Sequence, residues 1–333
     1  MNCRRLGAIG PEVSAIGLGL MGMSDLYGPA DRSESLATIH AALDAGITLL
    51  DTGDFYGMGH NELLISEALA RRDRSSLVIS VKFGALRDPA GNWAGYDARP
   101  LAVKNFLAYS LRRLGVDHID IYRPSRLDPH VPIEDTIGSL ADMVKGGYVR
   151  HIGLSEVGAE TIRRAAAVHP ISDLQIEYSL ISRGIEAEIL PTCRELGIGI
   201  TAYGVLSRGL ISGHWTKTRK DEHDFRGNSP RFQGANLEAN LALVETLRQI
   251  ADAMGASVAQ VAIAWVAAQG PDIVPLVGAR RRDRLAETLG ALDVKLSADA
   301  LAELAKALPL GVAAGERYPA AALAHLDSEK KRA

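Results

Sequence analysis

Eight short apolar runs recur along the chain, and amphipathic segments separate them. The runs lie at residues 15–20, 47–51, 77–82, 118–122, 149–155, 173–177, 197–203 and 272–277. Strands that alternate with helices predict a parallel sheet, because parallel neighbours need a crossover connection. Eight such units predict a (β/α)₈ TIM barrel, and a chain of 333 residues can form one as a single α/β domain. We expect residues 1–315 to form this barrel and residues 316–333 to form a C-terminal tail that is partly disordered.

A doubly wound sheet is the rival architecture. It requires a glycine-rich phosphate-binding turn between its first strand and its first helix. Gly17, Gly19 and Gly22 match that spacing by letter, but the segment that follows, SDLYGPADRS, is typical of a loop. A lone match of this kind is weak evidence, so the barrel is favoured.

The net charge and the spacing of the two cysteines argue against several classes of protein. The formal net charge is -3 and the basic residues are spread along the chain, which argues against nucleic-acid or membrane-surface binding. Cys3 and Cys193 are far apart and fit no metal spacing. The first residues lack the apolar core of a signal peptide, and no apolar run is long enough to span a bilayer. We therefore expect a reduced, cytoplasmic protein without a metal, and the oligomeric state stays open.

The active site of such a barrel lies at the carboxyl ends of its strands. Asp51 ends the second run, Tyr56 follows five residues later, and Lys82 ends the third run. A phenol ionises near pH 10 and is a reluctant acid at neutrality, but a nearby cation lowers its pKa. A carboxylate, a phenol and an ammonium at adjacent strand ends therefore suit acid catalysis. The alternative interpretation is an ordinary salt bridge beside a tyrosine on the rim.

The motifs around these residues resemble a known family. The chain contains, in order, LDTGDFYGMGHNE, SVKFG, LGVDHIDIY, PIEDTIGSLADMVKGGYVRHIGLSE, QIEYSL, AYGVLSRGLISG and LVGARRRDRLAETLGAL. Together they resemble the aldo-keto reductases, NADPH-dependent carbonyl reductases on a (β/α)₈ barrel. The resemblance implies that Tyr56 is the general acid, that Lys82 depresses its pKa, and that Asp51 pairs with Lys82.

One position departs from the family. Similar members often read Y-x-x-H-R-x-D-P after the fourth strand, with a catalytic histidine, whereas this chain reads YRPSRLDP and has Ser125 at that place. Loss of one donor to the reacting oxygen costs on the order of 10²–10³ in rate. Three interpretations stay open: Ser125 or a water that it holds substitutes, Arg123 reaches in as a charged donor, or the site is altered for another substrate or for weak turnover.

The segment GARRRDRLAETLG after the eighth run predicts an anion site. A glycine turn into a helix exposes backbone N–H groups and the positive end of the helix dipole, and several arginines gather there. The resemblance implies that Arg280 and Arg284 hold the 2′-phosphate of NADP, with Glu287 and Thr288 facing the adenine. Arginine is the usual partner of a 2′-phosphate, so NADPH is favoured over NADH.

The other cofactor positions also follow from the resemblance. Ser155 and Gln175 match residues that bind the carboxamide, and Tyr203 matches the aromatic residue that stacks on the nicotinamide. Glu156 stands where other branches often have asparagine. The remaining positions expected near the cofactor are Met21, Gly22, Asp51, Leu206, Ser207, Arg208 and Gly278.

Aromatic loop residues suggest the walls of a substrate site. Trp93, Phe55, Tyr27, Trp215 and Phe232 lie on loops that we expect near the open face of the barrel. Residues 224–234 resemble the mobile substrate loop of the family.

These features predict an NADPH-dependent oxidoreductase that reduces an aldehyde or ketone to an alcohol by hydride transfer, with Tyr56 as general acid. The same site would also serve NADP-dependent oxidation of a secondary alcohol. Ser125 keeps a third hypothesis open, a weakly catalytic NADP-binding sensor or partner protein. A metal-dependent hydrolase is disfavoured, because no cluster of His and Asp ligands follows the strands. The expected partner is a small-molecule carbonyl or alcohol.

Overall fold

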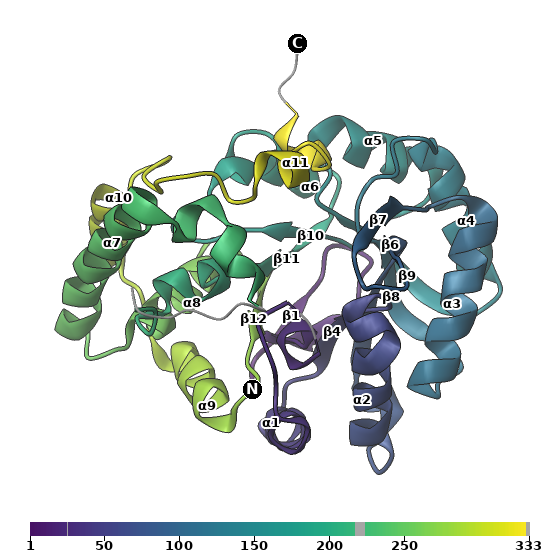
Figure 1. Cartoon of the computed structure of the whole chain (residues 1–333), viewed down its shortest axis with the longest axis horizontal. Coiled ribbons are helices and arrows are strands. Elements are labelled where there is room, and N and C mark those ends of the chain that lie inside the picture. The colour runs from purple at the N-terminus through teal and green to yellow at the C-terminus, as the bar shows by residue number, and fades with distance from the viewer. Residues whose placement is uncertain (25, 217–223, 331–333) are drawn as a thin grey trace.

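The computed structural model describes residues 1–24, 26–216 and 224–330, and these form a closed parallel barrel ringed by helices (Figure 1). The strand order around the barrel is β10-β11-β12-β3-β4-β5-β8-β9. The strands are β3 (Gly17–Gly19), β4 (Leu49–Gly53), β5 (Val78–Phe83), β8 (Ile119–Pro124), β9 (Val149–Ser155), β10 (Asp173–Glu177), β11 (Gly199–Tyr203) and β12 (Ile273–Gly278). Each overlaps one predicted run, so the (β/α)₈ TIM barrel is confirmed.

Among the described residues, no glycine-rich turn leads directly from the first barrel strand into an α-helix, as a doubly wound sheet requires. A 3₁₀ turn, Met21–Met23, follows β3, and the first helix, α1 (Arg32–Asp44), begins only after a further loop. Asp31 caps that helix, and its side chain accepts a hydrogen bond from the N–H of Glu34 at 2.7 Å. The helix start is therefore set by Asp31, well beyond the glycines.

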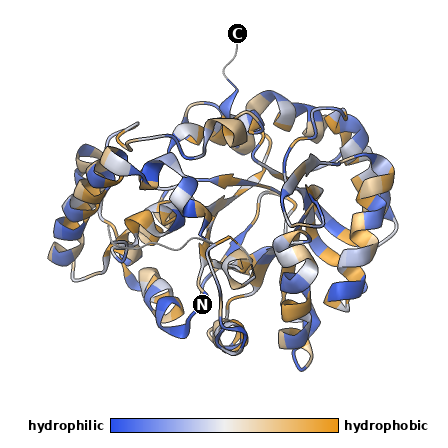
Figure 2. Ribbon diagram, viewed as in Figure 1, coloured by the Kyte–Doolittle hydropathy of each residue, from blue (hydrophilic) through white to orange (hydrophobic). Residues whose placement is uncertain are grey.

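The helices lie outside the barrel and shield the strands. They are α2 (His60–Leu69), α3 (Pro100–Leu114), α4 (Ile133–Lys145), α5 (Ala159–Val168), α6 (Ile189–Glu195), α7 (Gly234–Ala253), α8 (Val258–Ala268), α9 (Arg282–Gly290), α10 (Ala298–Ala307) and α11 (Ala320–Leu323). Figure 2 shows polar and apolar residues alternating along the helices of the outer ring. Among the described residues no single helix is long and apolar enough to cross a bilayer, and α7 and α8 meet that criterion only when joined across an 85° bend.

The N-terminal hairpin closes the barrel at the amino ends of its strands. It consists of β1 (Cys3–Arg5) and β2 (Glu12–Ser14), which pair antiparallel. Leu6 and Val13 from this hairpin are buried in one apolar cluster with Leu49, Val78, Ile121 and Val274 of the barrel strands. The opposite end of the barrel, at the carboxyl ends of the strands, is the end that carries loops.

Three segments lie around the carboxyl-end mouth. The first is the hairpin of β6 (Ala85–Arg87) and β7 (Trp93–Tyr96), and the second follows β11 and carries 3₁₀ turns at Ser207–Ser212, Phe225–Asn228 and Pro230–Phe232. The third is the C-terminal segment, whose described part, 316–330, contains α11 and a 3₁₀ turn at Asp327–Glu329. The sequence predicts a partly disordered tail at residues 316–333. Residues 316–330 have defined structure, and residues 331–333 lie outside the described residues. The division at residue 315 stays a prediction.

Candidate active site

Asp51, Tyr56 and Lys82 lie together at the mouth, as the sequence predicts. β4 and β5 are neighbours in the barrel, with Gly53 opposite Lys82 in the register, so the ends of these strands meet. Lys82 Nζ donates to Asp51 Oδ1, and both side chains are buried. The same ammonium lies 5.1 Å from the centroid of the Tyr56 ring. The three groups can therefore exchange a proton with an oxygen placed at the mouth.

Two further side chains hold the Asp51 carboxylate in place. Ser80 Oγ donates to Asp51 Oδ2 at 2.9 Å, and Gln175 Nε2, from the end of β10, donates to the same oxygen at 2.7 Å. Both carboxylate oxygens are thus engaged, which fixes the orientation of Asp51 toward Lys82.

The electrostatics differ from the expectation drawn from the family. Burial raises the pKa of Tyr56 well above its ordinary value, and the Asp51 carboxylate raises that pKa further. The Arg126 guanidinium opposes this rise. Burial lowers the pKa of Lys82, Asp51 works against that lowering, and Arg123 and Arg126 reinforce it. The pKa of Tyr56 is thus raised overall, whereas the resemblance implied a depressed one, and the part of Lys82 in it stays a prediction.

Ser125 lies directly after β8 at the position expected for the family histidine. Its backbone N–H donates to the carbonyl of Phe83 on β5 at 2.8 Å. The side chain is buried, and its hydroxyl has no hydrogen-bond partner among the described residues. A buried hydroxyl without a partner is costly, so this oxygen is available to a ligand or a water.

The proposal that Arg123 reaches into the mouth is wrong. Its side chain is completely buried in the barrel interior, where Nη1 binds Asp173 Oδ2 at 2.9 Å and Nη2 donates to Ser80 Oγ at 3.0 Å. Thr201 donates to the same Asp173 oxygen at 2.5 Å. Side chains alternate along a strand: Tyr122 points outward and stacks on Phe83, so its neighbour Arg123 points inward.

Arg126 is a residue at the mouth that the sequence analysis did not select. Its Nη1 donates to the carbonyl of Ser125 at 2.6 Å, and its Nη2 lies 3.5 Å from the hydroxyl of Tyr318 in the C-terminal segment. The available signal was its place in the motif, immediately after the substituted histidine position. A cation there faces the same space as the residue before it.

The ends of β9, β10 and β11 carry the residues expected to meet the nicotinamide. Ser155 is buried, and its hydroxyl lacks a partner among the described residues. Gln175 is the residue that binds Asp51. Tyr203 lies at the mouth, where its hydroxyl donates to Glu156 Oε1 at 2.6 Å and lies 3.0 Å from the Tyr318 hydroxyl.

Glu156 binds the C-terminal segment through a buried ion pair. Its backbone takes a left-handed φ of 53°, which is uncommon outside glycine. Arg317 binds both carboxylate oxygens, at 3.0 and 2.5 Å, and Ser328 donates to Oε2 at 2.7 Å. Burial opposes ionisation, but the Arg317 guanidinium holds the pKa of Glu156 far below its usual range. Glu156 therefore serves as the anchor of residues 316–330, a contact that no local sequence pattern signals.

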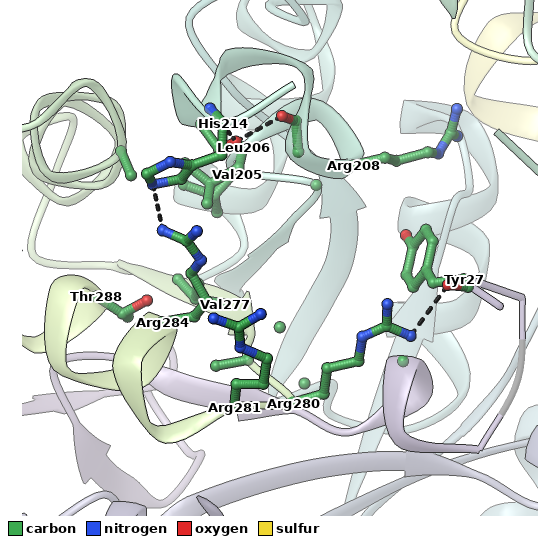
Figure 3. A pocket seen from close by; sticks show the side chains of 18 of the residues that line it. Tyr27, Val205, Leu206, Arg208, His214, Val277, Arg280, Arg281, Arg284 and Thr288 are labelled. Atoms are coloured by element: carbon green, nitrogen blue, oxygen red, sulfur yellow. Dashed lines mark hydrogen bonds between the residues drawn. The ribbon is translucent and has the colours of Figure 1, made fainter. Parts of the chain in front are cut away.

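A cavity of about 340 Å³ extends from the mouth between the end of β3 and α9 (Figure 3). Eight of the positions expected near the cofactor line it, namely Gly22, Leu206, Arg208, Gly278, Arg280, Arg284, Glu287 and Thr288. Met21 and Ser207 are adjacent in sequence to lining residues but do not line the cavity themselves. Tyr27, His214 and Arg281 also line it, and the sequence analysis had not placed them there.

Arginines from the start of α9 give the cavity a cationic end. Figure 3 shows Arg280, Arg281 and Arg284 projecting toward one space. Arg280 Nη1 donates to three carbonyls, those of residues 27, 28 and 29, at 3.0–3.3 Å. Arg284 Nη1 donates to Glu287 at 3.1 Å and contacts His214 Nε2 at 2.6 Å. Glu287, which was expected to face the adenine, is thus held by a cation of the cavity.

The residues present fit a nicotinamide dinucleotide. The unpartnered Ser155 hydroxyl lies beside Gln175 and Tyr203 at one end, where a carboxamide and its ring would need donors and an aromatic surface. The arginines and the helix start of α9 lie at the other end, where phosphate groups would need positive charge. The cavity extends from the arginines along the C-terminal side of β3 and β12 to Gly204, the residue after Tyr203.

Comparisons with known proteins agree with this geometry. A sequence profile of the Aldo/keto reductase family matches residues 15–309. A protein of Glycine max named probable aldo-keto reductase 1 is 42% identical over 315 residues, which is 94% of this chain and 91% of that protein. Among solved structures, a glycerol dehydrogenase from Gluconobacter oxydans is 30% identical with a TM-score of 0.84, covering 92% of this chain and 94% of that one. An aldo-keto reductase from Bacillus halodurans, 24% identical over 92% and 96% of the two chains, shares the fold with a TM-score of 0.77.

Proposed function

This chain belongs to the aldo/keto reductase family, and on that premise we propose that it reduces an aldehyde or ketone with NADPH, using Tyr56 as the proton donor. The observation that carries the proposal is the buried Asp51–Lys82 pair beside the Tyr56 ring, next to a cavity with a cationic end. The family is one of oxidoreductases that use nicotinamide cofactors. Tyr56 as the acid, the phosphorylated cofactor and the substrate are what we propose here.

Tyr56 delivers the proton to the substrate oxygen. Because burial and Asp51 raise its pKa, the hydroxyl is protonated at neutral pH and ready to donate. The oxygen of a carbonyl that gains a hydride becomes an alkoxide, a stronger base than a phenolate, so the proton moves downhill. The phenolate left behind lies near Lys82 and within the field of Arg126, and both cations stabilise it.

Ser125 donates a hydrogen bond to the carbonyl oxygen, directly or through a water. Its hydroxyl is without a partner and lies at the histidine position of the family. A serine has a shorter reach than a histidine, so a bound water is the natural intermediary for substrates held farther away. The burial of Arg123 removes it from this role.

The cofactor is held at both ends of the cavity by this chain's own residues. Arg280 and Arg284 bind the 2′-phosphate. Tyr203 stacks on the ring, and Ser155 and Gln175 bind the carboxamide. The other positions expected near the cofactor, Met21, Gly22, Asp51, Leu206, Ser207, Arg208, Gly278, Glu287 and Thr288, shape the space between. When bound, the nicotinamide supplies the hydride that reaches the carbonyl carbon, and the buried mouth keeps water from competing.

The reverse reaction is a second candidate. The Gluconobacter oxydans relative is a glycerol dehydrogenase, and the same residues would accept a proton from an alcohol when NADP⁺ is bound. Tyr56 would then act as the base. The two directions share one site, so they are distinguished by supplying either substrate.

The test is NADPH consumption by absorbance with a panel of aldehydes, diketones and larger ketones, for the wild type, Tyr56→Phe and Ser125→His. We expect Tyr56→Phe to lose roughly 10²–10⁴ in turnover and to bind NADPH as tightly as the wild type in a fluorescence titration. Turnover that survives in Tyr56→Phe would refute the acid assignment. Tight NADPH binding without turnover in either direction would instead favour the sensor or partner role.

A further inference from the structure

Arg126 is a partly buried cation at the barrel mouth without a carboxylate partner among the described residues. Among the described residues it contacts the carbonyl of Ser125 at 2.6 Å and, at the long distance of 3.5 Å, the hydroxyl of Tyr318. The Ser125 carbonyl engages one Nη atom only. The guanidinium has five N–H donors, so most of its hydrogen-bonding capacity is unused by these contacts.

Four other arginines at this end of the barrel are paired with carboxylates. Arg123 binds Asp173 at 2.9 Å, and Arg317 binds Glu156 at 2.5 Å. Arg208 and Arg231 both lie within ion-pair distance of Glu177, at 3.4 and 3.8 Å. A guanidinium that is taken out of water is stable only when an opposite charge or several acceptors compensate it. The Glu156 carboxylate attracts Arg126 at longer range but makes no ion pair with it among the described residues, so the N–H donors of Arg126 can still bind an anion.

The residues around Arg126 are suited to bind the uncharged part of a ligand that carries an acidic group. Arg126 contacts the carbonyl of Ser125, and its charge acts on Tyr56, the proposed acid, and on Tyr96 of β7. Phe55 packs edge-on against Tyr56 with ring centroids 4.8 Å apart, and Trp93 lies 5.7 Å beyond it with 51% of its surface exposed. Aromatic rings next to a planar cation accommodate an apolar or aromatic body that carries one acidic group.

We propose that Arg126 binds a carboxylate on the substrate, so that the enzyme prefers carbonyl compounds that carry an acidic group. This rests on the proposed function, because the carbonyl is taken to lie at Tyr56 while the carboxylate lies at Arg126. Arg126 is thereby a specificity-determining residue. The bidentate fork of a guanidinium matches the two oxygens of a carboxylate.

The first experiment compares turnover of the 2-, 3- and 4-carboxybenzaldehydes with that of their neutral methyl esters, so that charge changes while the aldehyde is kept. In the wild type we expect at least one acid to exceed its ester in kcat/KM by roughly 10- to 100-fold, the range of one charge-assisted contact. Arg126→Gln should remove that preference, chiefly through KM; because Arg126 also stabilises the Tyr56 phenolate, acids and esters should share any fall in kcat. Arg126→Lys should keep part of it.

Arg99→Gln is the matched control. Arg99 is an exposed arginine paired with Asp97 near the same rim, so its loss changes the overall charge equally without touching Arg126. An equal fall in kcat/KM for acids and esters in Arg126→Gln would mean that Arg126 acts only on Tyr56 or on the reacting oxygen, and would overturn the proposal. So would a preference for acids that survives in Arg126→Gln.

Binding to the NADP⁺ complex tests the site without turnover. Calorimetry should show that benzoate binds at least tenfold more tightly than benzamide, and that Arg126→Gln abolishes the difference. If no aldehyde is reduced but this preference is found, the proposed function fails while the carboxylate site stands. If turnover is normal and benzoate gains nothing over benzamide, the carboxylate site fails while the reductase stands.

Discussion

At the scale of single residues, the proposed preference for NADPH over NADH depends on Arg284. Its guanidinium lines the cavity and contacts Glu287 and His214. We predict that Arg284→Gln weakens NADPH binding by roughly 10- to 100-fold, the range for loss of one charge-assisted hydrogen bond, and alters NADH binding by less than threefold. Fluorescence titration of both cofactors measures this.

The control for this prediction is Arg282→Gln. Arg282 belongs to the same arginine run but binds Glu34 on α1 at 2.9 Å, and it is absent from the cavity lining. Its replacement should affect neither cofactor by more than threefold. A similar loss of NADH and NADPH affinity in Arg284→Gln would contradict a role in binding the 2′-phosphate.

The sequence was sufficient to bring Asp51, Tyr56 and Lys82 together, because residues at the carboxyl ends of adjacent parallel strands must meet. It was insufficient for Arg123, whose direction depends on which face of β8 each residue takes, and it did not single out Arg126, three residues further on. The pKa of Tyr56 was also misjudged, because burial acts on it more strongly than any cation nearby. Such effects depend on the three-dimensional surroundings, which a motif does not specify.

At the scale of elements, the strands were predictable and the C-terminal segment was not. A strand is signalled by its own apolar run, whereas residues 316–330 are held by partners far away in the chain. Arg317 reaches Glu156, which is 161 positions away, and Asp327 accepts the N–H of Gly158 at 2.9 Å at the start of α5. An alanine-rich, charged segment gives no local sign of such contacts.

Arg317→Gln should loosen this segment. It leaves the Glu156 carboxylate buried without its partner, and breaking a buried ion pair in this way costs about 3–5 kcal/mol of unfolding free energy. We predict a clearly lower Tm and faster hydrogen exchange at residues 316–330. Thermal denaturation and exchange followed by mass spectrometry provide the two measurements.

Arg163→Gln supplies the comparison, because it breaks an exposed pair with Glu195 and should change Tm little. The double variant Glu156→Gln with Arg317→Gln should recover part of the lost stability, since it removes the buried charge. If Arg317→Gln is as stable as Arg163→Gln, the segment is held by other contacts.

At the scale of the whole molecule, the periodicity of the chain determined the architecture. All eight strands and the closed order followed from alternation, since a parallel barrel is the simplest way to bury eight apolar runs beneath amphipathic helices.

Stability as a function of pH is also a property of the whole molecule, and one buried carboxyl group, that of Asp54, dominates its predicted pH dependence. Burial raises the pKa of Asp54 to about 8, with Glu62 adding to the effect and Arg113 opposing it.

The sign of this pH dependence follows from the number of protons that the folded and unfolded states bind. Between about pH 4 and pH 8 the folded protein keeps the Asp54 proton while the unfolded chain has released it, so the free energy of unfolding falls as pH rises, by up to about 1.4 kcal/mol per pH unit. The contribution is complete below pH 4 and lost as pH passes through about 8. We predict that Asp54→Asn flattens this dependence relative to the wild type in urea unfolding from pH 5 to pH 8.

Asp252→Asn serves as the control, because Asp252 is exposed at the end of α7. It should leave the slope of the wild type unchanged. Parallel curves for the wild type and Asp54→Asn across this range would show that Asp54 is ionised in the folded protein.

The interior pair of Arg123 and Asp173 has a consequence for inheritance. Either charge alone would be buried without its counter-charge, because Ser80 only accepts a hydrogen bond from Arg123 and Thr201 only donates one to Asp173. A substitution at one of these positions alone should therefore destabilise the barrel. We expect selection to favour changes at both positions together. We expect the two positions to covary among related genes, with a basic residue at one wherever an acidic residue stands at the other.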